Sequence, residues 1–296
     1  MKSASTLRRA ALPGLAAVAV FALLSACAPS STEPTSAPTE AGTPSAGDCT
    51  PAHTFPTVHE GVLTVVGVDG PPSFYTVAGG SGFSGPEYDL IQAFAAENCL
   101  ELDLTAMTGA AATLAMSETQ ADVMIGFIQQ TEQRREQFNI PSNFLVHEAL
   151  AIVSEEGYTT IQELAGKKVG VGSGSAAERL LSVSAPDLEL SGYPGLPDGL
   201  ADVEAGRIDA FIQGSIQVYY QVQVRDNGLT VHVLDADPAF PEETALQTTG
   251  WILTKGNDQL TTAVEDFYDQ VHADGTLEKA LKDNDIPNTE FYLNGR

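Results

Sequence analysis

Short apolar runs alternate with amphipathic stretches along most of the chain, and this alternation constrains the fold more than any other feature. The run Val62–Val68 is rich in β-branched residues and ends at a Gly-Pro-Pro turn, which predicts a strand. Expected strands cover 62–68, 100–107, 122–126, 168–172 and 208–212, and expected helices cover 88–97, 110–119, 176–183, 200–205 (capped by Asp198), 258–273 and 276–284. This order predicts open α/β lobes with mostly parallel sheets, whose ligands bind beyond the carboxyl ends of the strands.

Composition narrows the class of protein. The 296 residues are 43% hydrophobic and 18% charged, which is too apolar for a disordered chain and long enough for two lobes of ordinary domain size. The formal net charge is -25, with 14 basic and 39 acidic residues. We therefore expect no nucleic-acid partner, because a phosphate backbone is bound by clustered Lys and Arg.

The N-terminal segment has the features of an export signal. It is basic at Arg8-Arg9, and residues 11–24 are almost all small or apolar. This apolar stretch is too short for a stop-transfer helix that would span the membrane. It ends in Leu24-Ser25-Ala26-Cys27, which looks like the lipobox of bacterial lipoproteins. We expect a signal peptide over 1–26 and a lipid anchor on Cys27, which would hold an extracytoplasmic domain at the cell membrane. An ordinary secretory signal is the alternative, and Sec and twin-arginine export both stay open.

A polar segment follows the anchor. Residues 27–57 are mostly Ser, Thr, Pro, Ala, Gly and Glu, a composition typical of a flexible tether. Cys49 and Cys99 are the other two cysteines, and export would place them in an oxidising compartment. A Cys49–Cys99 disulfide is the favoured interpretation, and two unpaired thiols are the alternative.

Motifs for metal, nucleotide and nucleophilic chemistry are absent from the sequence. The histidines, at 53, 59, 147, 232 and 272, show no metal-ligand spacing, and no P-loop, Rossmann fingerprint or G-x-S-x-G elbow occurs. Gly170-Val171-Gly172-Ser173-Gly174 is rich in glycine but lacks a P-loop lysine. We therefore expect no metal, no cofactor and no catalytic residue.

Two segments have the pattern of anion-binding half-sites. Thr131 suits a helix N-cap directly after the strand 122–126, and Arg134 brings a two-pronged donor to the same place. Ser175 and Glu178 have the spacing of a capping box after the strand 168–172, where free helix amides attract negative charge. An exposed arginine and plain helix capping are the alternatives. Two such segments in successive α/β units favour a shared anionic ligand.

Five motifs also occur along the chain in a fixed order. They are Gly85-Pro86-Glu87-Tyr88-Asp89-Leu90, 122–134 with Thr131 and Arg134 in register, 166–171 with 174–178, Gly206-Arg207-Ile208-Asp209-Ala210, and Ala273-Asp274-Gly275-Thr276. With them the chain from about Glu60 to Asn284 resembles the bacterial extracellular solute-binding proteins of family 3, the polar amino-acid receptors of ABC importers.

The resemblance implies a fold and a domain division. The fold would be a two-lobed α/β clamshell of the type II periplasmic-binding-protein class, with mostly parallel sheets and two hinge crossings near Leu150 and Gly250. Lobe 1 would hold residues 58–148 and 250–296, and lobe 2 residues 149–249.

The resemblance also implies a binding site. Arg134 would grip the ligand's α-carboxylate, helped by amides near Thr131 and by the helix start at Ser175 and Ala176. An aromatic after the first strand, Phe74 or Tyr75, would stack on the ligand.

Other positions depart from the family pattern. Gln129 and Phe127 replace small or hydroxyl residues, and Gly214, beside Gln213, replaces the acid that neutralises the ligand's ammonium. A buried ammonium needs a counter-charge, so either another acid supplies it, with Glu87 as the first choice, or the ligand is not a standard α-amino acid.

The resemblance implies capture and delivery without chemistry. The chain would be a monomeric receptor that binds a small carboxylate-bearing solute and docks on its ABC permease, touching the membrane only through the lipid anchor. Two alternatives are a dehydratase-like enzyme on the same fold, with Glu87 or Glu243 as general acid, and a ligand-sensing receptor.

Overall fold

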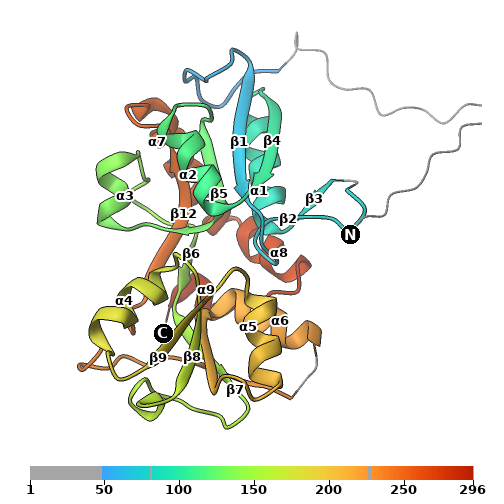
Figure 1. The fold of residues 1–296 in the computed structure, drawn as a ribbon. Helices are drawn as coiled ribbons and strands as arrows, with labels where there is room; N and C mark the ends of the chain where they lie inside the picture. The colour runs from blue at the N-terminus through green and yellow to red at the C-terminus, as the bar shows by residue number, and fades with distance from the viewer. Residues whose placement is uncertain (1–48, 81, 226–227, 296) are drawn as a thin grey trace, which may run out of the picture. The chain divides into compact units, whose positions relative to one another are not determined.

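Residues 49–80, 82–225 and 228–295 are described by a computed structural model (Figure 1). The expected signal peptide over 1–26, the lipidation site Cys27 and the tether as far as residue 48 lie outside the described residues. Two five-stranded sheets organise the described chain, and we name each sheet with its helices lobe 1 and lobe 2. No helix in the described ranges is long and apolar enough to cross a bilayer.

The lobe 1 sheet has the strand order β4-β1-β5-β12-β6. Its parallel centre consists of β1 (Val62–Val68) between β4 (Glu101–Met107) and β5 (Val123–Gln129). The strand β12 (Gln247–Leu253) returns from far along the sequence and pairs antiparallel with both β5 and β6 (Val146–Glu148). The sequence analysis did not expect β12, which joins the edge strand β6 to the parallel strands of the sheet.

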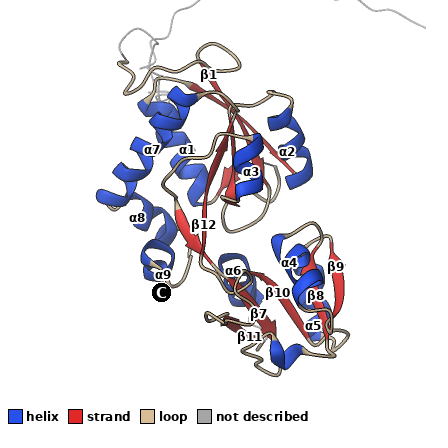
Figure 2. Ribbon diagram, turned by 90° about the vertical axis from the view of Figure 1, so that its left-hand side faces the viewer, coloured by secondary structure: helices blue, strands red, loops and turns tan. Residues whose placement is uncertain are grey.

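Helices cover both faces of this sheet, as the alternation of buried residues requires. Val65, Val123 and Trp251 belong to the large core that includes α1 and α7, whereas their neighbours Val66 and Met124 pack with α2. Figure 2 shows α1 and α7 on one side of the sheet and α2 on the other. The lobe 1 helices are α1 (Pro86–Glu97), α2 (Gly109–Ser117), α3 (Glu132–Gln137), α7 (Asp258–Ala273), α8 (Thr276–Asp283) and α9 (Thr289–Asn294). A small hairpin of β2 (Tyr75–Thr76) and β3 (Phe83–Ser84) precedes α1.

The lobe 2 sheet has the strand order β11-β7-β10-β8-β9. The strand β8 (Lys168–Gly172) lies parallel to both β9 (Glu189–Tyr193) and β10 (Ala210–Gly214). The strand β7 (Leu150–Ser154) pairs antiparallel with β10 and with β11 (Thr230–Val233). In both sheets, three parallel strands at one edge are followed by a strand, β12 or β7, that runs antiparallel to both of its neighbours, so lobe 2 repeats the plan of lobe 1.

The lobe 2 helices also pack on alternating residues. The helix α4 (Ala176–Ser184) shares a core with Val169, Val171 and Ile212, while α5 (Leu196–Glu204) and α6 (Ser215–Arg225) share another with Phe211. A 3-10 turn spans Gln162–Leu164. The expected cap at Asp198 is wrong, because α5 begins earlier with Gly195 as N-cap and a proline in its first turn. A proline suits that place since the first-turn amides have no helical partner.

The chain crosses between the sheets twice. It leaves lobe 1 after Glu148 and returns between the end of β11 and the start of β12 at Gln247. Residues 247–249, which the sequence analysis assigned to lobe 2, pair with β6 in the lobe 1 sheet. A disulfide joins Cys49 to Cys99, and so ties the start of the described chain to the end of α1.

Candidate ligand-binding site

The end of β5 is bent before it reaches the helix that carries Arg134. Gly126 and Phe127 have positive φ values of 135° and 47°. A side chain at position 126 is excluded, because its Cβ would lie 2.9 Å from the Cβ of Val68. The bend leaves the Phe127 side chain on the wall of a cavity.

Arg134 lies in the short helix α3 that follows β5. Thr131 is the N-cap, and its Oγ1 accepts a hydrogen bond from the Arg134 amide at 3.3 Å. The guanidinium donates from Nη1 to the Gln129 carbonyl oxygen at 2.6 Å. No carboxylate in residues 49–80, 82–225 or 228–295 forms a recorded ion pair with it. Burial and the charge of Arg179 lower the pKa of Arg134 from its ordinary value. Arg134 is therefore a half-buried cation that forms no ion pair with an acidic side chain of the described residues.

In lobe 2, α4 begins with a variant of the capping box, in which the glutamate accepts from the amide one residue before the N-cap. The Ser175 Oγ accepts from the Glu178 amide at 3.1 Å, and the Glu178 carboxylate accepts from the Gly174 amide at 2.6 Å. Ala176 and Ala177 occupy the first turn, where an amide has no partner inside the helix. These two amides remain available to an acceptor beyond the helix end.

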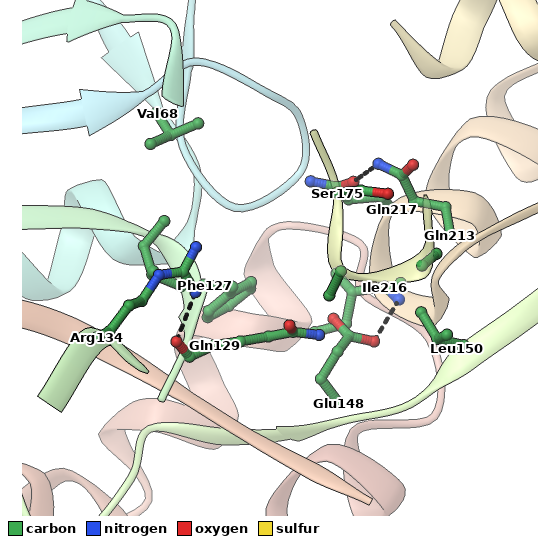
Figure 3. A pocket seen from close by; sticks show the side chains of 14 residues that line it. Val68, Phe127, Gln129, Arg134, Glu148, Leu150, Ser175, Gln213, Ile216 and Gln217 are labelled. Carbon is green, nitrogen blue, oxygen red and sulfur yellow. Dashed lines mark hydrogen bonds between the residues drawn. The ribbon is translucent and has the colours of Figure 1, made fainter. Parts of the chain in front are cut away.

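Arg134 of α3 and the first turn of α4 line one cavity of about 260 Å³ (Figure 3). Arg134 and Gln129 line it from lobe 1, and Ser175, Ala176 and Gln213 line it from lobe 2. The other lining residues are Val68, Phe127, Ile128, Glu148, Leu150, Ala177, Gly214, Ile216 and Gln217. The structure therefore brings these five predicted site residues together.

An adjoining cavity of about 740 Å³ extends the site between α3 and α4. Arg134, Gln129, Ser175 and Ala176 line this cavity as well, and Thr131 joins them. It also receives Arg179, an exposed residue of α4 that the sequence analysis did not single out.

The two aromatic candidates do not line either cavity. Phe74 is fully buried, with its ring 5.1 Å from that of Phe83. Its ring occupies space left by Gly67, where a Cβ would lie 2.1 Å from the Phe74 ring. Phe74 is therefore a core residue and the stacking prediction for it is wrong. Tyr75 lies half-buried in β2, outside the residues that line the two cavities.

The prediction that Glu87 supplies the counter-charge for a ligand ammonium is also wrong. It lies fully buried in the first turn of α1, and its carboxyl accepts a hydrogen bond from the Phe127 amide. Burial raises the pKa of Glu87 to about 8, although the amides of Phe127 and Gly126 act in the opposite direction. Glu87 lies behind the bend of β5 and does not line the cavity, so it is not a counter-charge for a ligand there.

Glu148 is the acidic residue that the sequence analysis missed. It lines the cavity from the first crossing, with 6% of its surface exposed. Its Oε1 accepts from the Ser215 hydroxyl at 2.6 Å, the Ala149 amide at 3.2 Å and the Ile216 amide at 3.3 Å. Burial raises the pKa of Glu148 to about 7. The one signal in the sequence was an acid beside the apolar run 149–153.

Gln213 contributes an amide to the cavity. Its Nε2 donates to the Oε1 of Gln217 at 2.6 Å, so the two side chains hold each other. The Gln213 Oε1 is buried and has no hydrogen-bond partner within the described residues. The wall of lobe 2 therefore presents amide groups as well as a helix end.

Neither acid proposed for catalysis lies in the cavity. Glu87 is sealed in the core, and Glu243 lines a separate cavity with Val183. The described ranges contain no cluster of three or more His, Cys, Asp and Glu side chains able to hold a metal ion. The arrangement is suited to binding a charged small molecule through Arg134 and the α4 amides.

A family model matches most of this region. Residues 64–283 match the model described as bacterial extracellular solute-binding proteins, family 3. The L-cystine-binding protein TcyJ of Escherichia coli (strain K12) is 26% identical over 225 residues, which covers 75% of this chain and 82% of that protein.

Solved structures share the fold. The amino acid ABC transporter substrate-binding protein AbpA from Streptococcus pneumoniae, bound to L-arginine, matches with a TM-score of 0.67 at 22% identity, covering 76% of this chain and 94% of that one. The ancestral amino acid-binding protein AncCDT-1, a precursor of cyclohexadienyl dehydratase, matches with a TM-score of 0.66 at 19% identity, covering 75% and 95%. The expected fold, a type II periplasmic-binding-protein clamshell of mixed α/β structure, is confirmed.

Proposed function

The chain belongs to the bacterial extracellular solute-binding proteins of family 3, and on this premise we propose that it captures a small carboxylate-bearing solute for an ABC importer. One observation carries the proposal. Arg134, without a recorded acidic partner among the described residues, lines the same cavity as the first turn of α4. A carboxylate bound there would satisfy both groups, because guanidinium and helix-terminal amides are strong donors to anions.

The solute is an amino acid or a close analogue. The relatives support this class, since TcyJ is a cystine-binding protein and AbpA was solved with L-arginine. A cavity of about 260 Å³ that opens toward a larger one accommodates side chains of different length. The carboxylate is the part common to all such ligands, and it is the part that Arg134 recognises.

Capture works by closure of lobe 2 on lobe 1. The ligand must touch both lobes, because a ligand shifts a conformational equilibrium only through its different affinity for the two states. Arg134 and Ala176 come from different lobes, and the two crossings next to Glu148 and Gln247 are the natural hinges. The closed form then docks as a monomer on the permease and releases the solute.

The protein acts without chemistry. An enzyme on this fold needs a general acid facing its substrate. Glu87 in the core and Glu243 in a separate cavity are not placed to be that acid, and the relatives TcyJ, a cystine-binding protein, and AbpA, a substrate-binding protein, support the receptor function over a dehydratase. Glu148 is the acid that lines the cavity, so a dehydratase activity would have to act through Glu148. Turnover of arogenate or prephenate by the purified protein would contradict this part of the proposal.

The lipid anchor is a further part of the proposal. The segment Leu24-Ser25-Ala26-Cys27 supports cleavage after residue 26 and acylation of Cys27, so that the receptor stays at the outer side of the cell membrane. Labelling with a palmitate analogue in the native host should modify the wild-type protein and not Cys27→Ala. Equal labelling of both proteins would show that Cys27 is not the site of acylation.

The main experiment is a calorimetric titration of the purified protein with the standard amino acids, cystine and small organic acids. At least one compound should bind, and Arg134→Ala should weaken that binding by about 2 kcal/mol or more, since a charge-assisted contact is lost. Arg135→Ala is the matched control, because its guanidinium donates to the Ile140 and Pro141 carbonyls and does not line the cavities. Unchanged affinity in Arg134→Ala would remove Arg134 from the site.

A further inference from the structure

The cavity carries two opposite charges at different places. Among its fourteen lining residues, Arg134 is the basic one and Glu148 the acidic one. The remaining residues are apolar or uncharged. Figure 3 shows Arg134 and Glu148 reaching the cavity from different parts of the chain. A ligand with a carboxylate alone would leave Glu148 without a positive partner.

The Glu148 carboxyl is held so that one oxygen is occupied and the other is not. All three recorded hydrogen bonds, from Ser215, Ala149 and Ile216, go to Oε1. No described residue forms a recorded hydrogen bond or ion pair with Oε2. A carboxylate that is 6% exposed is fixed in direction by such contacts, because three donors on one oxygen leave the side chain little rotation.

Gly214 keeps the second oxygen accessible. A Cβ at position 214 would lie 3.3 Å from both Cδ and Oε2 of Glu148. The φ angle of Gly214 is not among the positive values, so its backbone conformation does not require glycine. Because Gly214 has no side chain, the space in front of the Glu148 Oε2 stays open to a ligand.

We infer that in this chain the Glu148 carboxylate receives the ammonium of the amino-acid solute, and that Glu148 thereby selects amino acids over acids that lack an amine. The inference rests on the proposed function, because Arg134 must take the carboxylate for Glu148 to meet the amine. The acid that pairs with the ligand's ammonium is then neither the expected Glu87 nor a residue at position 214, which is glycine. It is Glu148, at the crossing between the lobes. An uncompensated acid buried in the cavity becomes paired when the ligand binds.

The test compares matched ligands and matched variants by calorimetry at pH 7.5. The probes are α-, β- and γ-amino acids and cystine, each paired with the acid of the same carbon skeleton that lacks the amine. Glu148→Gln keeps an oxygen to accept from Ser215, Ala149 and Ile216 but removes the negative charge. Glu243→Gln is the control, since it makes the same change in a buried glutamate that lines neither cavity of the site.

We expect the wild-type protein to bind at least one amino acid and to bind its amine-free partner at least tenfold more weakly. Glu148→Gln should lose tenfold to a hundredfold in affinity for the amino acid, whereas Glu243→Gln stays within twofold of the wild type. Gly214→Ala is the second variant, because it covers Oε2 while it keeps the Glu148 charge, and it should also weaken binding of the amino acid selectively.

Three results would overturn the inference. The first is that amine-free acids bind as tightly as amino acids, that Glu148→Gln binds like the wild type and that Arg134→Ala does not bind. The proposed function as a solute receptor would then be supported, and the role of Glu148 would be wrong. If Glu148→Gln weakens both ligands of a pair equally, Glu148 supports the structure and does not select an amine. If no compound of the panel binds, the proposed function and the inference fall together.

Discussion

The two strand-to-helix turns that face the cavity are built differently. In lobe 1, β5 leads through Thr131 into α3, a helix of six residues with none buried. In lobe 2, β8 leads through Ser175 into α4, which has nine residues and buries Ala177 and Leu181. The side chains of Ser175 and Glu178 each accept a backbone amide at its start. The lobe 1 turn delivers a charged side chain, and the lobe 2 turn delivers backbone amides.

The difference lies in what holds each turn in place. The bend before α3 is supported by Glu87, which is 40 positions away in the sequence and receives the Phe127 amide. The start of α4 is supported by Ser175 and Glu178, three positions apart. The lobe 1 half of the site therefore depends on tertiary packing, while the lobe 2 half is specified locally.

The largest effect should come from the support of the lobe 1 turn, as a pH dependence of stability. The folded-state pKa of Glu87 is raised to about 8 from 4.5, so between these pH values the folded protein holds a proton that the unfolded chain releases. The free energy of unfolding should therefore fall as pH rises through this range, by up to about 1.4 kcal/mol per pH unit. Glu87→Gln removes this fall, and urea denaturation between pH 5 and pH 9 measures it.

The interval above pH 7 is the informative one. Glu148 contributes a similar fall, but its pKa of about 7 confines it to lower pH, whereas that of Glu87 continues to about 8. Tyr268, which packs beside Glu87, has its pKa raised well above the ordinary value and stays neutral there. Parallel curves for wild type and Glu87→Gln above pH 7 would show that Glu87 is already ionised in the folded protein, and that its protonated form does not support the lobe 1 turn.

A smaller effect is expected from removing one amide of the lobe 2 turn. Ala176 is the first residue of α4, a place where proline fits and lacks only the N–H. Ser175 has φ -73° and ψ 165°, which is the conformation required before a proline. Ala176→Pro should therefore keep its stability and lose about tenfold or more in ligand affinity, since a hydrogen bond to a charged group contributes about 1.5–3 kcal/mol.

Ala176→Ser is the control for this substitution, because it changes the side chain and retains the amide. Calorimetry with the tightest-binding amino acid measures both variants, and thermal unfolding checks that α4 is intact. Wild-type affinity in Ala176→Pro would mean that lobe 2 reaches the ligand through side chains alone, and the two turns would then differ less than we argue.

Sequence patterns predicted the fold better than they predicted the walls of the site. The parallel strands β1 and β8 were found with their observed bounds, because apolar β-branched runs between turns are a local signal. The antiparallel strand β12 was missed, since it pairs with β5 from more than a hundred positions away. Arg134 and Ser175 were found because helix caps leave a fixed spacing in the sequence.

The errors at the site have one physical source. The direction of the Phe74 ring depends on the space above Gly67, and the accessibility of Glu148 depends on Gly214 and Ser215, which come far later in the chain. Glu87 shows the same limit, since its burial follows from packing behind the bend of β5. Which acid of a chain faces a ligand is decided by contacts between distant segments, and a local pattern does not contain them.

The smallest effect is expected from Arg179, the exposed arginine at the outer cavity. It tests whether lobe 2 supplies side-chain charge in addition to amides, because its charge acts on Arg134 across the site. For a ligand whose one negative group sits on Arg134, Arg179→Ala should lower affinity only about two- to fivefold at physiological salt, since solvent screens an exposed charge. The loss should shrink further in 0.5 M salt, and titrations at the two salt concentrations measure it. A loss above tenfold that persists in high salt would assign Arg179 a direct contact with a second acidic group of the ligand, and lobe 2 would then match lobe 1 in the way it binds.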